Sequence, residues 1–168
     1  MTGILAAVTG GGSSIILASG LYGPNGQDLT PIDSSGNSPI TINRTWIGYY
    51  IADQTTTRGF NVNATWTSNY NDGTQYSIAY LWVGATAKSG FNPGNANATA
   101  NNNVGSYNLS VVAGTYYAIR LQWTANLTSG SYGTNFPFTP YSTTGAFSFT
   151  IGGSSTPPLY YNSVTNGF

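Results

Sequence analysis

Few side chains in this sequence can carry out acid–base or nucleophilic chemistry. The chain has 168 residues with four Asp, three Arg and one Lys, and it contains no Glu, His or Cys. General acid–base catalysis needs titratable groups held together, and a serine nucleophile needs a neighbouring base. Lys88 and Ser89 are neighbours without that context, and 10–14 lacks the lysine of a phosphate-binding loop. The sequence therefore predicts that the protein is not an enzyme.

Amide and aromatic side chains are the better candidates for chemistry, and that chemistry is binding. Amides can donate to and accept from sugar hydroxyls, and aromatic rings can cover the apolar face of a sugar. Two interpretations remain open: loops that bind a sugar, and loops that are only solvated. The candidate ligand-binding residues are Asn69, Asn71, Asp72, Asn92, Asn95, Asn97, Asn101, Asn102 and Tyr132.

The candidate metal site consists of Asn71 and Asp72, with Asn69 nearby. Calcium accepts amide and carboxylate oxygens, but one carboxylate predicts weak affinity, and Asp72-Gly73 is also a turn sequence. We therefore expect no resident cofactor, with weakly bound calcium as the alternative. Arg120 lies in the middle of an expected strand, and we expect it to pair with Asp53 or Asp72.

The overall composition excludes several classes of protein. Charged residues make up 5% of the chain and the net charge is zero, so no basic surface attracts nucleic acid. No apolar run approaches the length of a membrane helix. The first residues lack the basic region of a secretory signal, which favours a virion protein. The alternative is that a signal was removed before Met1; in either case we expect a virion or extracellular surface location.

The elements that must position the candidate residues are short β-strands. Segment 106–123 shows the clearest alternation of apolar and polar residues, and its turn at 113–115 predicts an antiparallel hairpin at the core. Residues 90–103 are expected to form a long exposed loop. Together these patterns predict an all-β, jelly-roll-like antiparallel β-sandwich. The other expected strands lie at 40–51, 59–67, 76–83 and 144–151.

The sandwich is expected to span residues 39–152, between two extended arms. The N-terminal arm, 1–38, is rich in Gly, Ser and Pro and has at most one or two strands, and the C-terminal tail covers 153–168. Such termini are usually loose unless something holds them, so we expect the arms to contact partner chains. The candidate assembly residues are Ile15, Ile16, Leu17, Leu159, Tyr160 and Tyr161.

Three motifs occur in an order that resembles a known family. They are 46–50 (Trp-Ile-Gly-Tyr-Tyr), 80–84 (Tyr-Leu-Trp-Val-Gly) and 112–120 (Val-Ala-Gly-Thr-Tyr-Tyr-Ala-Ile-Arg). Over residues 44–151 the chain resembles the protective-antigen-like β-sandwich, especially GLEYA-type adhesin modules. Similar modules are found in phage and virus particle proteins. The resemblance implies a β-sandwich that can serve as an adhesin.

The resemblance also implies a calcium site for sugar binding. In the family, two consecutive aspartates shortly before the Leu-Trp-Ile-Gly strand hold the calcium. Counting back from Trp82 at the usual spacing leads to Tyr76 and Ser77, and the nearest carboxylate is Asp72, after Asn71. The resemblance therefore supports the fold better than it supports calcium-dependent sugar binding.

Three functional hypotheses follow. The first is a non-enzymatic phage virion surface protein, such as a capsid decoration or fibre protein, held by its arms in a homo-oligomer or to shell proteins, with glycan adhesion as an added activity. The second is a secreted adhesin module that binds host-surface glycans. The third is a pilus or surface-filament subunit in which the strand at 13–17 completes a neighbouring subunit. None of the three involves nucleic acid or membrane insertion.

Overall fold

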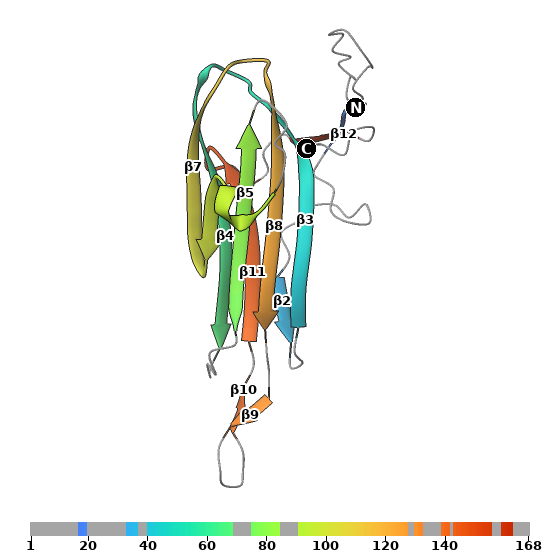
Figure 1. Ribbon diagram of the computed structural model, residues 1–168, viewed down its shortest axis with the longest axis vertical. Coiled ribbons are helices and arrows are strands. Elements are labelled where there is room, and N and C mark those ends of the chain that lie inside the picture. Colours follow the sequence, from blue (N-terminus) through green and yellow to red (C-terminus); the bar gives the residue numbers. More distant parts are fainter. Residues whose placement is uncertain are drawn as a thin grey trace.

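Two antiparallel β-sheets pack face to face into a β-sandwich, shown with its long axis vertical in Figure 1. Sheet A has the strand order β1-β12-β3-β8-β5-β6, and sheet B has the order β2-β11-β4-β7. The pair β9-β10 extends from one end, at the bottom of Figure 1. The predicted all-β sandwich is confirmed. The computed structural model describes residues 17–19, 33–36, 40–68, 75–84, 91–127, 130–132, 139–141, 143–155 and 159–162.

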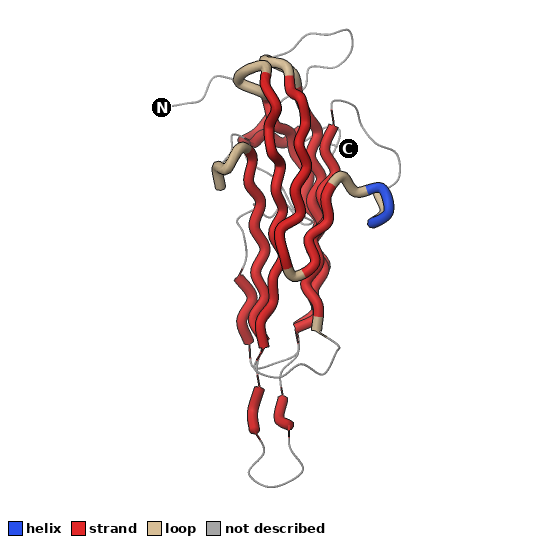
Figure 2. Tube along the Cα trace, turned by 90° about the vertical axis from the view of Figure 1, so that its left-hand side faces the viewer, coloured by secondary structure: helices blue, strands red, loops and turns tan. Residues whose placement is uncertain are grey.

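The strands of sheet A are β1 (Leu17–Ser19), β3 (Ile40–Ile51), β5 (Tyr76–Gly84), β6 (Ala98–Asn101), β8 (Tyr116–Leu127) and β12 (Leu159–Asn162). Those of sheet B are β2 (Asp33–Gly36), β4 (Thr56–Ser68), β7 (Asn103–Val111) and β11 (Thr143–Ile151), and the extending pair is β9 (Gly130–Tyr132) with β10 (Thr139–Tyr141). A 3-10 turn, η2 (Pro93–Asn95), lies at the side of the sandwich and is blue in Figure 2. Among the described residues, no helix is long and apolar enough to cross a membrane.

The core lies between the two sheets and is built on the central strand β8. This strand pairs with β3 along its whole length and with β5 on its other side. Alternate residues of a strand point to opposite faces, so one face of β8 turns its large side chains inward. Trp46 and Trp123 stack on Phe147 of the opposite sheet, with ring centroids 4.9 and 5.8 Å away. Burying each such side chain contributes about 1.5–3 kcal/mol before entropy.

The predicted hairpin within 106–123 is wrong. β7 pairs with β4 in sheet B, whereas β8 pairs with β3 and β5 in sheet A. The turn that joins them, with Gly114 at φ 77°, therefore crosses from one sheet to the other. Val111 and Tyr117 are both buried, because the two strands turn their apolar faces toward each other across the core. Alternation identifies the buried face of a strand but not the neighbour it pairs with.

The prediction of a long exposed loop at 90–103 is also wrong for the described residues 91–103. β6 pairs with β5, with Leu81 opposite Ala98 and Ile78 opposite Asn101. Its alanines, at 98 and 100, are buried, and the residues between and after them are exposed. Alanine and asparagine are poor strand formers, so their sequence gave little strand signal. The free edge of β5 supplies the hydrogen bonds that make this segment a strand.

Three strands from the predicted arms extend the sheets. β12 pairs with β3, with Leu159 opposite Tyr50, and β1 pairs with β12. β2 pairs with β11 in the other sheet. For residues 1–38 we expected one or two strands at most; the structure has two, β1 and β2, and both pair within the same chain. Ile15 and Ile16 lie outside the described residues. Contacts of the arms with partner chains stay a prediction.

Candidate functional site

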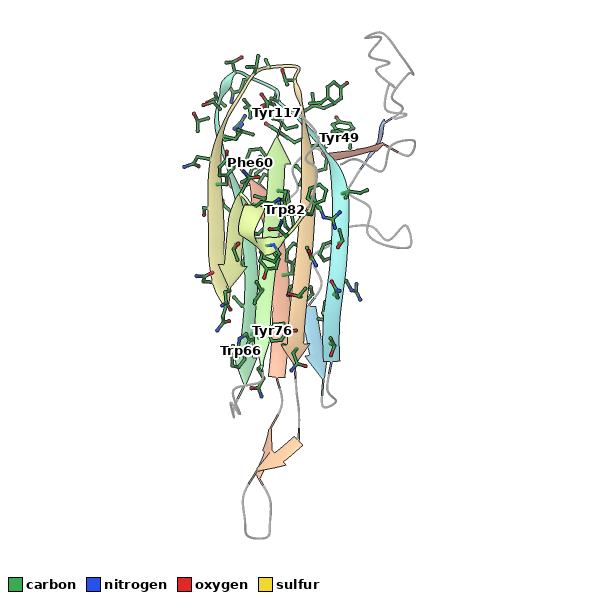
Figure 3. All side chains as sticks on the ribbon, in the orientation of Figure 1. Tyr49, Phe60, Trp66, Tyr76, Trp82 and Tyr117 are labelled. Atoms are coloured by element: carbon green, nitrogen blue, oxygen red, sulfur yellow. The ribbon has the colours of Figure 1, made fainter. Side chains whose placement is uncertain are left out.

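The candidate site lies at the end of the sandwich from which the β9-β10 pair extends. Here β4 ends and β5 begins, and Figure 3 shows Trp66 and Tyr76 at this end of the two strands. Tyr76 is 39% exposed, and Asn126 of β8 is its cross-strand partner. We call Trp66, Tyr76, Asn102 and Asn126 the strand-end site. The arrangement brings aromatic and amide groups from both sheets to one end of the molecule.

Asn102 joins the two sheets at the strand-end site. It has φ 52°, in the left-handed region that Asn tolerates better than most residues, and it forms the tight connection between β6 and β7. Its side-chain Oδ1 accepts a hydrogen bond from the Trp66 backbone N–H at 2.7 Å. Its own backbone N–H donates to the Ser77 carbonyl oxygen at 3.1 Å. These bonds fix the position of the β6–β7 connection relative to β4 and β5.

A second group of predicted residues lies elsewhere, on the outer face of sheet A. The Asn95 Oδ1 accepts a hydrogen bond from the Trp82 Nε1–H at 2.7 Å, and the Asn97 Oδ1 accepts one from the Val83 backbone N–H at 2.9 Å. Phe91 packs edge-on against Trp82, which is completely buried. These amides therefore hold the segment 91–97 over β5. Trp82 and Tyr76 are six residues apart on this strand, about 20 Å, so the two groups form separate regions.

Arg120 contacts aromatic rings and does not form the predicted ion pair with Asp53. Its guanidinium carbon lies 4.4 Å from the Phe91 ring centroid and 5.9 Å from that of Trp82. Asp53 pairs with Arg58 at 2.7 Å. The reason is geometric: Arg120 is in mid-strand opposite Trp82, whereas Asp53 lies in the connection after β3. Burial lowers the pKa of the Arg120 guanidinium, and its Nε has no hydrogen-bond partner.

The structure brings some of the predicted residues together and leaves others apart. Asn101 and Asn102 lie at the strand-end site, close to β4 and β5, while the asparagines at 92, 95 and 97 lie over Trp82. Tyr132 belongs to β9, which extends beyond the strand-end site. Asn69, Asn71 and Asp72 lie outside the described residues, in the connection between β4 and β5.

Comparison with known proteins identifies the family. The model of the GLEYA domain matches residues 42–140, which is more than half of the chain. The chain belongs to the GLEYA domain family. Neither this match nor the solved structure described below points to protective-antigen-like proteins or to proteins of phage or virus particles. None of the curated proteins matches.

One similar solved structure is the Epithelial Adhesin 6 A domain (Epa6A) from Candida glabrata, in complex with Galb1-3GlcNAc. The sequence identity is 15% and the TM-score is 0.46, and the alignment covers 88% of this chain and 66% of that one. This GLEYA domain thus spans just under two thirds of the length of that structure.

The calcium site implied by the family resemblance does not fit Tyr76 and Ser77. Ser77 is completely buried, and its Oγ already accepts a hydrogen bond from the Trp123 Nε1–H at 2.9 Å. Tyr76 offers only a phenol, and calcium prefers carboxylate and carbonyl oxygens. Within the described part of the GLEYA domain, no group of three or more His, Cys, Asp or Glu residues comes together. Calcium at Asn71 and Asp72 stays a prediction.

Sequence reasoning missed Trp66, Tyr76 and Asn126 as site residues. A signal for Tyr76 was present, because it is the first residue of the strand expected after the turn at 68–73 and alternation places it on the same face as Tyr80 and Trp82. Asn126 could not be found this way, because its position opposite Tyr76 depends on the pairing of β5 with β8.

Proposed function

We propose that this GLEYA domain is a non-enzymatic, glycan-binding module of a cell-surface adhesin, with the sugar held at the strand-end site. Membership of the family supports the class of function. The observation that carries the site is the exposed ring of Tyr76 beside Asn126, at the end of β5. An aromatic face covers the apolar side of a sugar, and amides bond to its hydroxyls.

The family match favours the second hypothesis from the sequence over the first and third. A virion surface role has no support from the comparisons, whereas an adhesin at an extracellular surface fits the GLEYA family. A pilus subunit would offer its N-terminal strand to a neighbour. Here Leu17–Ser19, which begins at the last residue of the segment 13–17, pairs with β12 of the same chain.

Replacing Tyr76 with alanine tests the strand-end site. Tyr76→Ala removes the exposed ring, so we expect affinity for a recognised glycan to fall about tenfold, equivalent to about 1.4 kcal/mol. A broad glycan array identifies the ligand, and calorimetry then measures the affinity. Tyr116→Ala is the matched control, because Tyr116 lies at the opposite end of β8 and is also partly exposed. Circular dichroism checks that both variants are folded.

The same test also measures whether glycan binding depends on calcium. Binding that persists after chelation supports direct recognition by aromatic and amide groups. Binding that is lost on chelation, and also in an Asp72→Asn variant, assigns calcium to Asn71 and Asp72. An array without signal in both conditions would contradict the proposed function. Equal affinity of the Tyr76→Ala and unsubstituted proteins would contradict the site.

A further inference from the structure

β7 is an edge strand. Among the described strands it is the last of sheet B and pairs with β4 alone. The backbone of β6 lies close to its first part, where the Thr99 carbonyl packs against Gly105. Among the described residues, no backbone group of 104–111 bonds outside that ladder. Natural edge strands are usually short or carry a charge, a proline or a bulge. β7 has nine residues, no proline and no charge, and no charged residue lies between Lys88 and Arg120.

The outer face of β7 is also unusually apolar at its two ends. Val104 is 58% exposed and Val112, just after the strand, is 54% exposed. Serine and asparagine occupy the alternate positions between them, at 106, 108 and 110. On the inner face, Tyr107 and Leu109 are only partly buried against the core. The strand thus presents apolar groups at both ends of one face and at the middle of the other.

The positions of these groups make β7 complementary to a second copy of itself. In an antiparallel pair centred on Asn108, the numbers of facing residues add up to 216. Tyr107 then faces Leu109 of the other copy, and each pair occurs twice because a two-fold interface is self-complementary. The ladder stops before Val112, whose backbone N–H donates to the Tyr117 hydroxyl and whose carbonyl accepts from the Thr115 N–H, so only its side chain comes opposite Val104. Facing side chains lie close enough to stabilise the pair. No other register places the two exposed valines opposite each other.

We infer that two copies of this protein associate through β7, in an antiparallel pair centred on Asn108 that joins the two B sheets into one. The contact is small compared with a standard protein interface, so the dimer is a weak one that forms at high local concentration. A surface that carries many adhesin copies provides that concentration. The centre of this association, Asn108, is six residues from Asn102 of the strand-end site, about 20 Å along β7.

Cysteine cross-linking tests the register directly, because the natural chain has no cysteine. Asn108→Cys places two thiols opposite each other, within the range of a disulfide. Ser106→Cys is the matched control, because two copies of residue 106 are four positions apart, about 14 Å, which is too far for a disulfide. In a mixture of Ser106→Cys and Ser110→Cys chains, position 106 of one copy faces position 110 of the other, so a disulfide can form. We expect disulfide-linked dimers from Asn108→Cys and from the mixture, and none from Ser106→Cys alone.

Light scattering across a concentration series tests the association without a cross-link. The unsubstituted full chain is expected to shift from monomer toward dimer as its concentration rises. Asn108→Lys puts two positive charges opposite each other and should keep the chain monomeric at every concentration. Ser148→Lys, on β11 two strands away from the edge, should dimerise like the unsubstituted chain. The chain is made in bacteria, because Asn108-Leu109-Ser110 is a glycosylation triplet in other hosts.

A chain that stays monomeric, with no disulfide from Asn108→Cys, would overturn the inference and would leave the β7 edge to a strand of another protein. A dimer that Asn108→Lys does not weaken would overturn it too, because another surface would then hold the copies together. Glycan binding is measured on the Asn108→Lys variant as well. Since the strand-end site does not include this residue, affinity for the sugar should be unchanged whatever the outcome for the dimer.

Discussion

The hydroxyl of Ser77, near the start of β5, accepts a hydrogen bond from the buried indole N–H of Trp123. Ser77 and Trp123 are both completely buried, and the bond between them measures 2.9 Å. A buried donor without an acceptor costs more than the bond itself contributes, because the donor has lost its contacts with water. At this position, near the strand-end site, the chain therefore uses a small hydroxyl to satisfy a core tryptophan.

Replacing Ser77 with alanine should lower the stability more than the loss of one exposed hydroxyl would. Ser77→Ala leaves the Trp123 Nε1–H buried without an acceptor, so we expect the free energy of unfolding to fall by about 1–3 kcal/mol. Urea denaturation followed by tryptophan fluorescence measures the loss. Ser148→Ala, at a partly exposed position of β11, should change the stability by no more than about 0.5 kcal/mol. Equal effects of the two substitutions would show that the indole bond contributes little.

At the scale of elements, two connections that cross between the sheets lie side by side at the end opposite the strand-end site. One crossing follows β3 and the other is the turn between β7 and β8. They bond to each other, because the Gly114 N–H donates to the Ala52 carbonyl at 2.8 Å and the Ala52 N–H donates to the Thr115 carbonyl at 3.2 Å. An ion pair between Asp53 and Arg58 adds to the first crossing. Each crossing therefore supports the other.

The ion pair predicts how the stability of this end depends on pH. The hydrogen bond from Arg58 lowers the pKa of Asp53. The ionised carboxylate of Asp53 is therefore more stable in the folded state than in the unfolded state. This contribution is complete above the ordinary Asp pKa of about 3.9 and is lost as pH falls through the lower folded value. Urea midpoints at about pH 6 and about pH 2 should differ less in Asp53→Asn than in the unsubstituted protein.

The Asp53 side chain is 68% exposed and the Arg58 side chain 23%, so water screens the pair from the Asp53 side and the effect is small. Arg58→Gln provides the partner control and should flatten the acid dependence to a similar extent. If both variants keep the full acid dependence, the pair does not contribute to stability.

The strands themselves could be predicted from the sequence, but their pairings could not. β3, β4, β5, β8 and β11 all lie where alternating apolar residues placed them, because burial of one face imposes that alternation. The same alternation fits a hairpin and a crossing between sheets, which is why 106–123 was assigned wrongly. β6 depends on the free edge of β5, and the strand-end site depends on the pairing of β5 with β8. Neither dependence leaves a local signal in the sequence.

At the scale of the whole molecule, both sheets are completed by strands from the two ends of the chain. β2 pairs with β11 over 33–36, and β12 pairs with β3 and brings Leu159 against the core. The arms that contain these strands are rich in glycine and proline, and this composition predicted that they would be loose. Their order comes from the open edges of β3 and β11, which offer unpaired backbone groups to any nearby strand. The arms thus contribute to the sandwich, whatever they contact outside it.

Removing both arms tests this contribution. A chain cut to residues 39–152 loses β1, β2 and β12, so β11 loses one of its two partners and Leu159 no longer packs on the core. We expect the free energy of unfolding to fall by about 1.5 kcal/mol or more, the scale of burying one leucine, and the urea slope to fall with the buried area. A chain cut to residues 1–162, which keeps all three strands, should match the full chain. If the 39–152 chain unfolded at the same urea concentration, the arms would serve assembly alone.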